Sequence, residues 1–314
     1  MLQYLIILLD DTSVAFCHAD NPLKERNLMP IDTLRKAILF GMKENLMIQF
    51  VYPDYELPAE YDDVIESIDH TKIGKDVKIY NSVPAAVEGK NVVLRLSLSE
   101  VVEKQYDIAA LLSQVERMNI CLTDIESYND GMQEAYAKAL DTLNEMLVNL
   151  YKSQKAPQLN VLTDRLQLKE MHNCEAGVGN ITVAPNGKFY ICPAFYYDEK
   201  LGIDDQMNHV KKTSNYAVGD LERGLNIPNK QLLQLDHAPL CRECDAYHCN
   251  RCVWLNQKLT WDINTPSRQQ CIVSHLERNA SRKLQVELKK FFQLEGEEIK
   301  EITYLDPFDA REQW

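Results

Sequence analysis

The sequence of 314 residues lacks several features that would assign a protein quickly to a class. Its apolar runs fall short of the roughly 20 residues that a membrane-spanning helix needs. The start, MLQYLIILLDD, has neither the basic residues nor the small-residue cleavage site of a signal peptide. Neither a G-x-G-x-x-G fingerprint nor a P-loop is present, so the usual signals for bound nucleotides are missing. We therefore expect a cytoplasmic protein with no membrane partner.

Positive charge is also scarce, with 34 Lys and Arg against 47 Asp and Glu and a net charge of −13. The excess lies in residues 1–150, which carry 25 acidic and 13 basic side chains, whereas residues 151–314 carry 22 and 21. Phosphate backbones are bound by patches of Lys and Arg, so no nucleic-acid partner is expected. The acidic half indicates a solvated surface or, alternatively, a face for a basic partner or peptide.

Compact apolar runs of strand length alternate with helical patterns in the first 168 residues. Strands are predicted at 3–10, 46–53, 76–82, 92–96, 119–125 and 158–168. Helices are predicted at 59–69, at 99–116, at 130–152, and from an N-cap at Asp32, with Leu34, Ile38, Leu39 and Met42 facing inward. Alternating βα units indicate an α/β fold with a mostly parallel sheet, either an open sheet or an incomplete barrel.

The pattern changes near residue 169, where the chain becomes rich in cysteine and loops. The segment NITVAPNGKFYIC, residues 180–192, predicts a hairpin that turns at Pro-Asn-Gly, residues 185–187. A last helix is predicted at 275–293. We thus expect a first domain at 1–168, a second at 169–293 and a charged tail at 294–314.

Nine cysteines are present, and seven of them fall between residues 174 and 271. In a reducing cytosol such thiols favour metal binding over disulfides. A Cys-x-x-Cys pair can place two sulfurs on one metal ion, and seven thiolates exceed the four that a structural zinc takes. They suffice for two metal centres, one with four sulfurs and one with three. On spacing alone, zinc and iron–sulfur clusters stay equally open.

The order of these seven cysteines resembles the SPASM domain, the iron–sulfur extension of many radical SAM peptide-modifying enzymes. Cys174 is followed by twelve residues, Gly187, four residues and Cys192, as in that family. The Asn-Gly turn and the VGDL at 218–221 are also similar. The central CRECDAYHCNRC, 241–252, reads C-x2-C-x4-C-x2-C, one residue shorter than the family pattern in each of its later gaps.

The resemblance implies two [4Fe–4S] clusters that share the cysteines in an interleaved way. The first would be held by Cys174, Cys192 and Cys252. The second would be held by Cys241, Cys244, Cys249 and Cys271. Many members of the family add a fourth cysteine just upstream of Cys174, where this sequence has none. The first cluster could therefore keep an open iron, or His172 or a peptide thiol could close the site.

A radical SAM enzyme also carries C-x3-C-x2-C in the loop after its first barrel strand. Here that loop holds Cys17 alone, and Cys121 is the only other cysteine before residue 174. We expect both to be buried small hydrophobic residues. The chain is therefore not expected to cleave S-adenosylmethionine by itself. It looks like a degenerate, partial radical-SAM-like (β/α) barrel followed by a SPASM domain.

This combination resembles the CXXX repeat peptide maturases, which occur beside a true radical SAM enzyme. The resemblance implies an accessory role in maturing ribosomally made peptides, by peptide binding or electron transfer. The implied partners are a cysteine-containing precursor peptide and a radical SAM maturase, as a possible heterodimer. Two alternatives stay open: a zinc-stabilised peptide- or protein-binding module, and a stand-alone iron–sulfur electron carrier.

Overall fold

The computed structural model describes residues 2–171, 174–202 and 215–292. The chain divides into two compact units, in which unit 1 is Met1–Ala15, Ala19–Asp76 and Cys174–Gln234, and unit 2 is Phe16–His18, Val77–Asn173 and Leu235–Trp314. The residue ranges of these two units differ from the domains predicted at 1–168 and 169–293. That division into domains stays a prediction. The predicted tail at 294–314 and His172 lie outside the described residues.

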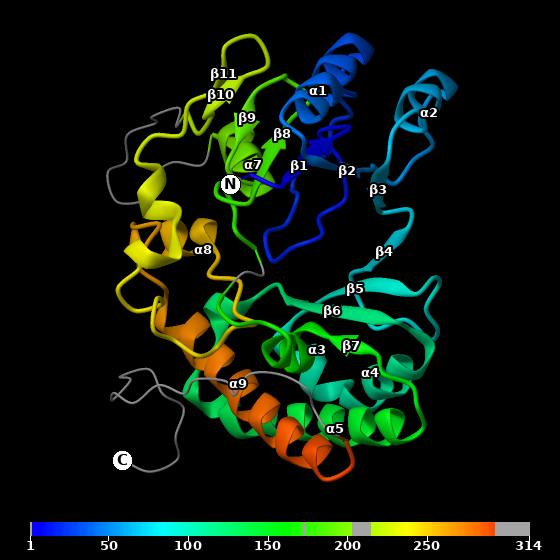
Figure 1. The fold of residues 1–314 in the computed structure, drawn as a ribbon, viewed down its shortest axis with the longest axis vertical. Helices are drawn as coiled ribbons and strands as arrows, with labels where there is room; N and C mark the ends of the chain where they lie inside the picture. The colour runs from blue at the N-terminus through cyan, green and yellow to red at the C-terminus, as the bar shows by residue number, and fades with distance from the viewer. Residues whose placement is uncertain (1, 172–173, 203–214, 293–314) are drawn as a thin grey trace. The chain divides into compact units, whose positions relative to one another are not determined.

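Unit 1 contains five neighbouring strands in the order β3-β2-β1-β8-β9 (Figure 1). Its strands are β1 Tyr4–Leu8, β2 Met47–Val51, β3 His70–Ile73, β8 Asn180–Val183 and β9 Phe189–Tyr190. All neighbours are parallel except β8 and β9, which form the predicted hairpin around Gly187. The further elements are α1 Ile31–Lys43, α2 Ala59–Ile65, α7 Pro193–Leu201, a small hairpin of β10 Gly219–Asp220 and β11 Gly224–Leu225, and the 3₁₀ turn η5 Lys230–Leu233.

Helix α1 corrects part of the sequence prediction for unit 1. It begins at Ile31 after Pro30, not at an Asp32 cap. Leu39 and Met42 were expected to face inward, yet they are 63% and 59% exposed. The buried stripe instead includes Ala37 and Gly41. The small residues were overlooked because hydrophobicity, and not size, set the predicted stripe; at Gly41 even a Cβ would come within 2.9 Å of the Ile48 side chain.

Unit 2 contains four neighbouring parallel strands in the order β4-β5-β6-β7, covered by helices. Its strands are β4 Val77–Tyr80, β5 Asn91–Leu96, β6 Arg117–Leu122 and β7 Gln158–Leu159. Its α-helices are α3 Leu98–Glu103, α4 Gln105–Leu111, α5 Gln133–Lys152, α6 Asn160–Thr163, α8 Val253–Thr260 and α9 Arg268–Lys289. The 3₁₀ turns are η1 Leu112–Gln114, η2 Ile125–Ser127, η3 Asp130–Met132, η4 Asp164–Leu166 and η6 Leu235–His237.

The predicted strand at 158–168 is wrong beyond its first two residues. The Asn160 side chain takes over the pairing with β6, because it accepts from the Ile120 N–H (2.8 Å) and donates to the Ile120 carbonyl (3.0 Å). Thr163 Oγ1 likewise accepts from the Leu159 N–H at 2.8 Å, so the chain turns into α6. The apolar alternation that suggested a strand therefore belongs to a short, buried helical turn.

Helices α5 and α9 pack along one another in unit 2 (Figure 1), and this fixes the element that carries Cys271. Leu143, Leu147 and Leu284 are completely buried in their common core. The Asn144 amide donates to the Ala280 carbonyl at 2.9 Å, which sets the register between the two helices.

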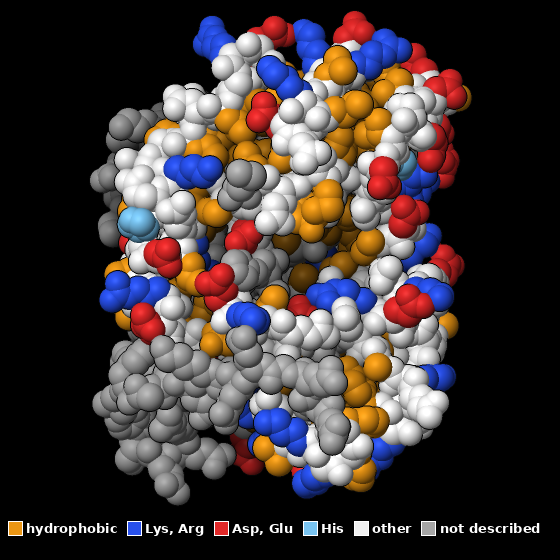
Figure 2. Space-filling view, in the orientation of Figure 1, with side chains coloured by type: hydrophobic (Ala, Val, Ile, Leu, Met, Phe, Trp, Pro, Cys, Tyr) orange, Lys and Arg blue, Asp and Glu red, His pale blue; other side chains and the backbone are white. Residues whose placement is uncertain are grey.

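The surface carries both signs of charge on the described part of the face in Figure 2, where red acidic and blue basic side chains occur close together. Among the described residues, no helix combines the length and the apolar character that crossing a bilayer requires.

Candidate metal-binding site

The cysteine-rich segment of unit 2 is a series of tight turns. The Cys241 N–H donates to the Ala238 carbonyl (2.9 Å) and the Cys244 N–H to the Cys241 carbonyl (3.0 Å). The Cys249 N–H then donates to Ala246 at 2.9 Å. Each turn satisfies backbone groups locally, so a segment without a long helix or strand can stay buried. The turns place three thiols within nine residues.

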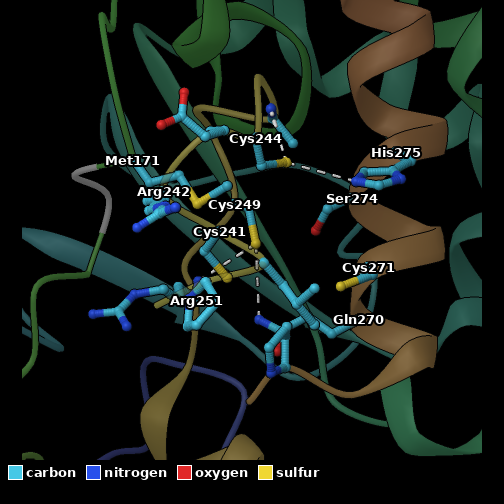
Figure 3. A pocket seen from close by; sticks show the side chains of 15 residues that line it. Met171, Cys241, Arg242, Cys244, Cys249, Arg251, Gln270, Cys271, Ser274 and His275 are labelled. Carbon is cyan, nitrogen blue, oxygen red and sulfur yellow. Dashed lines mark hydrogen bonds between the residues drawn. The ribbon is translucent and has the colours of Figure 1, made fainter. Parts of the chain in front are cut away.

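Helix α9 supplies the fourth thiol. The Ser267 hydroxyl caps its first turn by accepting from the Gln270 N–H at 3.2 Å. The helix therefore begins just before Cys271, whose side chain lies on the face that also carries His275, four residues later. Figure 3 shows both side chains directed from α9 toward the turns that hold the other cysteines.

A cavity of about 250 Å³ lies between these turns and α9. Its lining includes all four cysteines that were predicted to share one centre: Cys241, Cys244, Cys249 and Cys271 (Figure 3). Its volume is that of several water molecules, which take about 30 Å³ each in the liquid. The cavity thus brings together the predicted second set of ligands around a common space.

Backbone N–H groups already point at two of the sulfurs. The Ala246 N–H donates to Cys244 Sγ at 3.5 Å, and the Arg251 N–H donates to Cys249 Sγ at 3.4 Å. In each case the donor lies two residues after the cysteine. The Gln270 amide adds a longer contact of 3.9 Å to Cys249 Sγ. Donors of this kind stabilise a sulfur that carries negative charge, as a metal-bound thiolate does.

Burial raises the pKa of the Cys244 thiol to about 12, although the Ala246 N–H and the charge of Arg278 act in the opposite direction. Burial likewise raises the pKa of Cys249, against the hydrogen bonds from Ser274 and Arg251. Metals bind the thiolate form, so binding at these two residues would release protons.

The four thiols are the type of ligand that a thiolate-binding metal centre uses, and they line one cavity. No disulfide ties up any of the nine cysteines. Among the described residues, however, no group of three or more His, Cys, Asp or Glu side chains is already arranged to hold a metal ion. The thiols would therefore have to turn toward a common centre when they bind one.

The three cysteines predicted for the other centre are divided between the units. Cys174 and Cys192 belong to unit 1 and Cys252 to unit 2. Cys192 precedes the first residue of α7. Cys252 caps α8, since its Sγ accepts from the Leu255 N–H at 3.4 Å. All three are half-buried, and their joint role stays a prediction.

A buried ion network lies directly beside Cys244. Asp245 is 1% exposed and pairs with Arg278 and Arg282 at 3.1 and 2.7 Å, and with Arg165 at 3.2 Å. Arg165 also donates from Nε to the Asp245 carbonyl at 2.8 Å. Three guanidinium groups therefore face one buried carboxylate. At the Cys244 thiol the two signs of this network oppose each other, since the charge of Asp245 raises its pKa and that of Arg278 lowers it.

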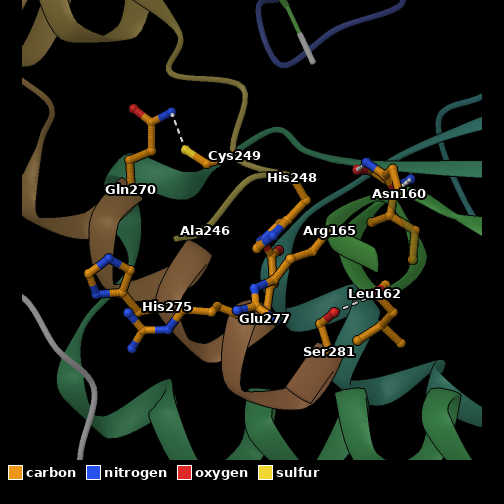
Figure 4. A network of polar contacts seen from close by, with 12 residues as sticks. Asn160, Leu162, Arg165, Ala246, His248, Cys249, Gln270, His275, Glu277 and Ser281 are labelled. Carbon is orange, nitrogen blue, oxygen red and sulfur yellow. Dashed lines mark hydrogen bonds and ion pairs between the residues drawn. The ribbon is translucent and has the colours of Figure 1, made fainter. Parts of the chain in front are cut away.

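A second buried network connects the cysteine turns to α5 and α9. His248 Nε2 lies 3.1 Å from Glu277 Oε2, and Tyr136 donates to Glu277 Oε1 at 2.7 Å. Figure 4 shows His248 and Glu277 facing each other beside Arg165. Burial, followed by the charge of Glu277 and the hydrogen bond to it, raises the pKa of Tyr136 well above its usual value, so it stays a neutral donor. Both networks were missed in the sequence because they join residues far apart in the chain.

The loop after β1 is held by polar contacts within unit 1. Asp10 accepts from the Thr12 N–H at 2.8 Å and from the Tyr55 hydroxyl at 2.9 Å. Asp11 pairs with Lys200 at 3.0 Å and accepts from Tyr196. These side-chain contacts fix the start of the loop.

Cys17 and Cys121 were expected to be buried, but both are half-buried. They lie in unit 2, where the Arg95 Nε donates to the Cys17 carbonyl at 2.7 Å and Cys121 Sγ lies 3.8 Å from the Phe16 carbonyl. Their positions follow from the segment Phe16–His18 packing in unit 2, which the periodicity of the sequence did not predict.

No family model matches the sequence, and no curated protein matches it. The structure is similar to the solved structure of native anSMEcpe with bound AdoMet, a radical-SAM-type protein. The TM-score is 0.58 at 9% identity, and the alignment covers 92% of this chain and 100% of the other. At this identity the similarity shows the fold alone, so the chain has a mixed α/β, radical-SAM-like fold. The predicted fold class is confirmed at that level, and its SPASM part stays a prediction.

Proposed function

We propose that the chain is an iron–sulfur accessory protein of peptide maturation that acts with a separate radical SAM enzyme. The observation that carries this proposal is the cavity lined by Cys241, Cys244, Cys249 and Cys271. Four thiolates are the usual set for a [4Fe–4S] cluster. The radical-SAM-like fold adds support, because the resemblance to CXXX repeat peptide maturases rests on that fold and on the order of the cysteines.

The four cavity cysteines would hold one cluster, and Cys174, Cys192 and Cys252 would hold the other. When bound, such clusters supply one-electron transfer. The chain's own contribution is to exclude water from the buried sulfurs and to direct N–H groups at Cys244 and Cys249. The proposed partners are a cysteine-containing precursor peptide and the radical SAM maturase.

The first test is anaerobic reconstitution of the full chain with iron and sulfide. We expect broad absorption near about 400 nm and about seven to eight irons per chain, following three plus four thiolates. Cys241→Ala should lose roughly half of the iron, because it removes one ligand of the cavity. Cys121→Ala is the matched control, since Cys121 lies outside the cavity lining. Equal iron in Cys241→Ala and Cys121→Ala would contradict the ligand assignment.

A zinc-stabilised binding module is the second candidate, and His275 in the cavity lining is the observation that favours it. Cysteine and histidine together are common zinc ligands, with spacings similar to Cys241-x2-Cys244 and Cys271-x3-His275. Metal analysis of protein purified anaerobically separates the candidates. Stoichiometric zinc without visible absorption would favour the binding module over the iron–sulfur protein.

The partner is tested by anaerobic copurification with a radical SAM maturase and a Cys-x-x-x repeat peptide. We expect a complex that contains both proteins, and peptide modification only when this chain is present. Full modification by the radical SAM enzyme alone would remove the accessory role, whatever the metal content.

A further inference from the structure

His275 lies in the cavity wall and is not one of the four thiolate ligands of the proposed iron–sulfur cluster. Its side chain is on α9, one helical turn after Cys271, and the residue is only 3% exposed. Its Nε2 lies 3.6 Å from Cys244 Sγ, within reach of a nitrogen–sulfur hydrogen bond (Figure 3). The contact joins α9 to the turn that begins the cysteine segment, 31 residues apart in sequence.

The helix holds His275 in place independently of the cysteine turns. The capped first turn of α9 fixes its start, and the Asn144–Ala280 contact fixes its register against α5. The imidazole therefore approaches Cys244 from a rigid element. Since the Ala246 N–H approaches the same sulfur at 3.5 Å, Cys244 Sγ has polar contacts from two separate segments.

We propose that His275 donates an N–H···S hydrogen bond to the Cys244 thiolate and thereby raises the reduction potential of the iron–sulfur cluster in this cavity. The inference rests on the proposed function. Reduction adds negative charge to the sulfur ligands, so a donor to one of them stabilises the reduced form more than the oxidised form. His275 acts through Cys244 and is a positioning residue, because four thiolates already complete the ligand set.

Two substitutions at this position separate the hydrogen bond from the packing. His275→Ala removes the donor, and His275→Gln keeps an amide N–H near the position of Nε2. Both residues are good helix formers, so α9 should persist. His237→Ala is the control, because His237 is an exposed histidine of unit 2 outside the cavity lining.

The measurement is an anaerobic redox titration of each full-length reconstituted protein, followed spectroscopically. The signal of the cavity cluster is the one that Cys241→Ala lacks. We expect His275→Ala to keep its iron and to shift this signal to a more negative potential. His275→Gln and His237→Ala should stay close to the unaltered protein.

The outcomes distinguish this inference from the function on which it rests. If the unaltered protein binds no iron, the proposed function fails and the inference with it. If iron is bound and His275→Ala leaves the potential unchanged, only the inference is overturned. Loss of about half of the iron in both His275→Ala and His275→Gln would also overturn it, by making His275 a ligand or a structural requirement.

Discussion

The Asp245 carboxylate faces three guanidinium groups in a buried setting. Burial alone would raise the pKa of the Asp245 carboxyl. The charges of Arg278, Arg282 and Arg165 together lower it by more, so its pKa lies below the usual value. The carboxylate therefore stays ionised at neutral pH and keeps the three arginines together.

Asp245→Asn should reduce the free energy of unfolding of the metal-free protein by about 3–5 kcal/mol, the usual effect of removing one partner from a buried ion pair. Denaturant unfolding of the unaltered and substituted proteins measures this difference in free energy. Asp141→Asn is the matched control, since Asp141 pairs with Lys283 at 2.9 Å but is 44% exposed. That change should cost under about 1 kcal/mol. Equal losses for the two variants would contradict the role given to Asp245.

The stability difference between the unaltered protein and Asp245→Asn should also depend on pH. A carboxylate whose folded pKa is depressed contributes stability above its unfolded pKa of about 3.9, and this contribution is lost as the pH falls through the folded pKa. The difference in stability between the unaltered protein and Asp245→Asn should therefore be constant near neutral pH and shrink below about pH 4. A difference that persists undiminished at pH 2 would show that ionisation of Asp245 is not its source.

Among the elements, the small hairpin of β10 and β11 depends on a glycine that tolerates no side chain. Gly219 has φ of 130°, and a Cβ there would lie 2.1 Å from the Gly224 carbonyl oxygen. Gly219→Ala should destabilise the protein by about 3 kcal/mol or more, because backbone strain and a backbone clash combine.

Gly202→Ala is the comparison for this change. Gly202 ends α7 with φ of 61°, and nothing lies within 4 Å of the added Cβ. It should cost only the left-handed strain, about 1–2 kcal/mol. Thermal unfolding of both variants tests the difference, and a larger loss for Gly202→Ala would contradict it.

The strands of the parallel sheets and the hairpin around Gly187 were predictable, because buried apolar runs and a Pro-Asn-Gly turn are local signals. Strand β3, with the sequence HTKI, was missed since its polar residues give no such signal. Helix α6, Asn160–Thr163, was predicted as a strand, because the deciding contacts of Asn160 lie with Ile120, 40 residues away.

The candidate site was likewise predictable from the sequence only in part. The spacing of the cysteines, together with a family resemblance, proposed Cys241, Cys244, Cys249 and Cys271 as one group, and these four line one cavity. His275 lies four residues after Cys271 on α9, but the last helix was predicted to begin only at residue 275, so their common face was missed. The arginines around Asp245 could not, since residue 165 and residues 278–282 meet only in the folded chain.

At the scale of the whole molecule, the sequence lacks the three clustered cysteines that radical SAM enzymes carry after their first strand. A similar fold binds AdoMet in anSMEcpe, yet this chain has only Cys17 and Cys121 before residue 174. We expect the isolated, reduced protein to form no 5′-deoxyadenosine from S-adenosylmethionine, because two thiols cannot supply the three ligands that the resembled enzymes use. Chromatography against a no-protein control measures it, and formation above that control in a preparation free of other radical SAM enzymes would overturn the expectation.

Metal binding should also determine the stability of the whole chain. The cysteine segment of unit 2 consists of turns around buried thiols, so a metal that binds only the folded form adds its binding free energy to folding. Chelator treatment should lower the melting temperature of the unaltered protein and of Cys121→Ala by more than that of Cys241→Ala, because the last variant keeps only the other proposed centre.

The pKa of the Cys244 thiol, about 12, sets the sign of the pH effect on metal affinity. At neutral pH this thiol must lose a proton to bind, so apparent metal affinity should rise with pH, by up to about tenfold per pH unit for each proton released. Competition with a metal indicator between pH 6 and pH 9 tests this, and an affinity that falls with pH would mean that these buried thiols are not the ligands.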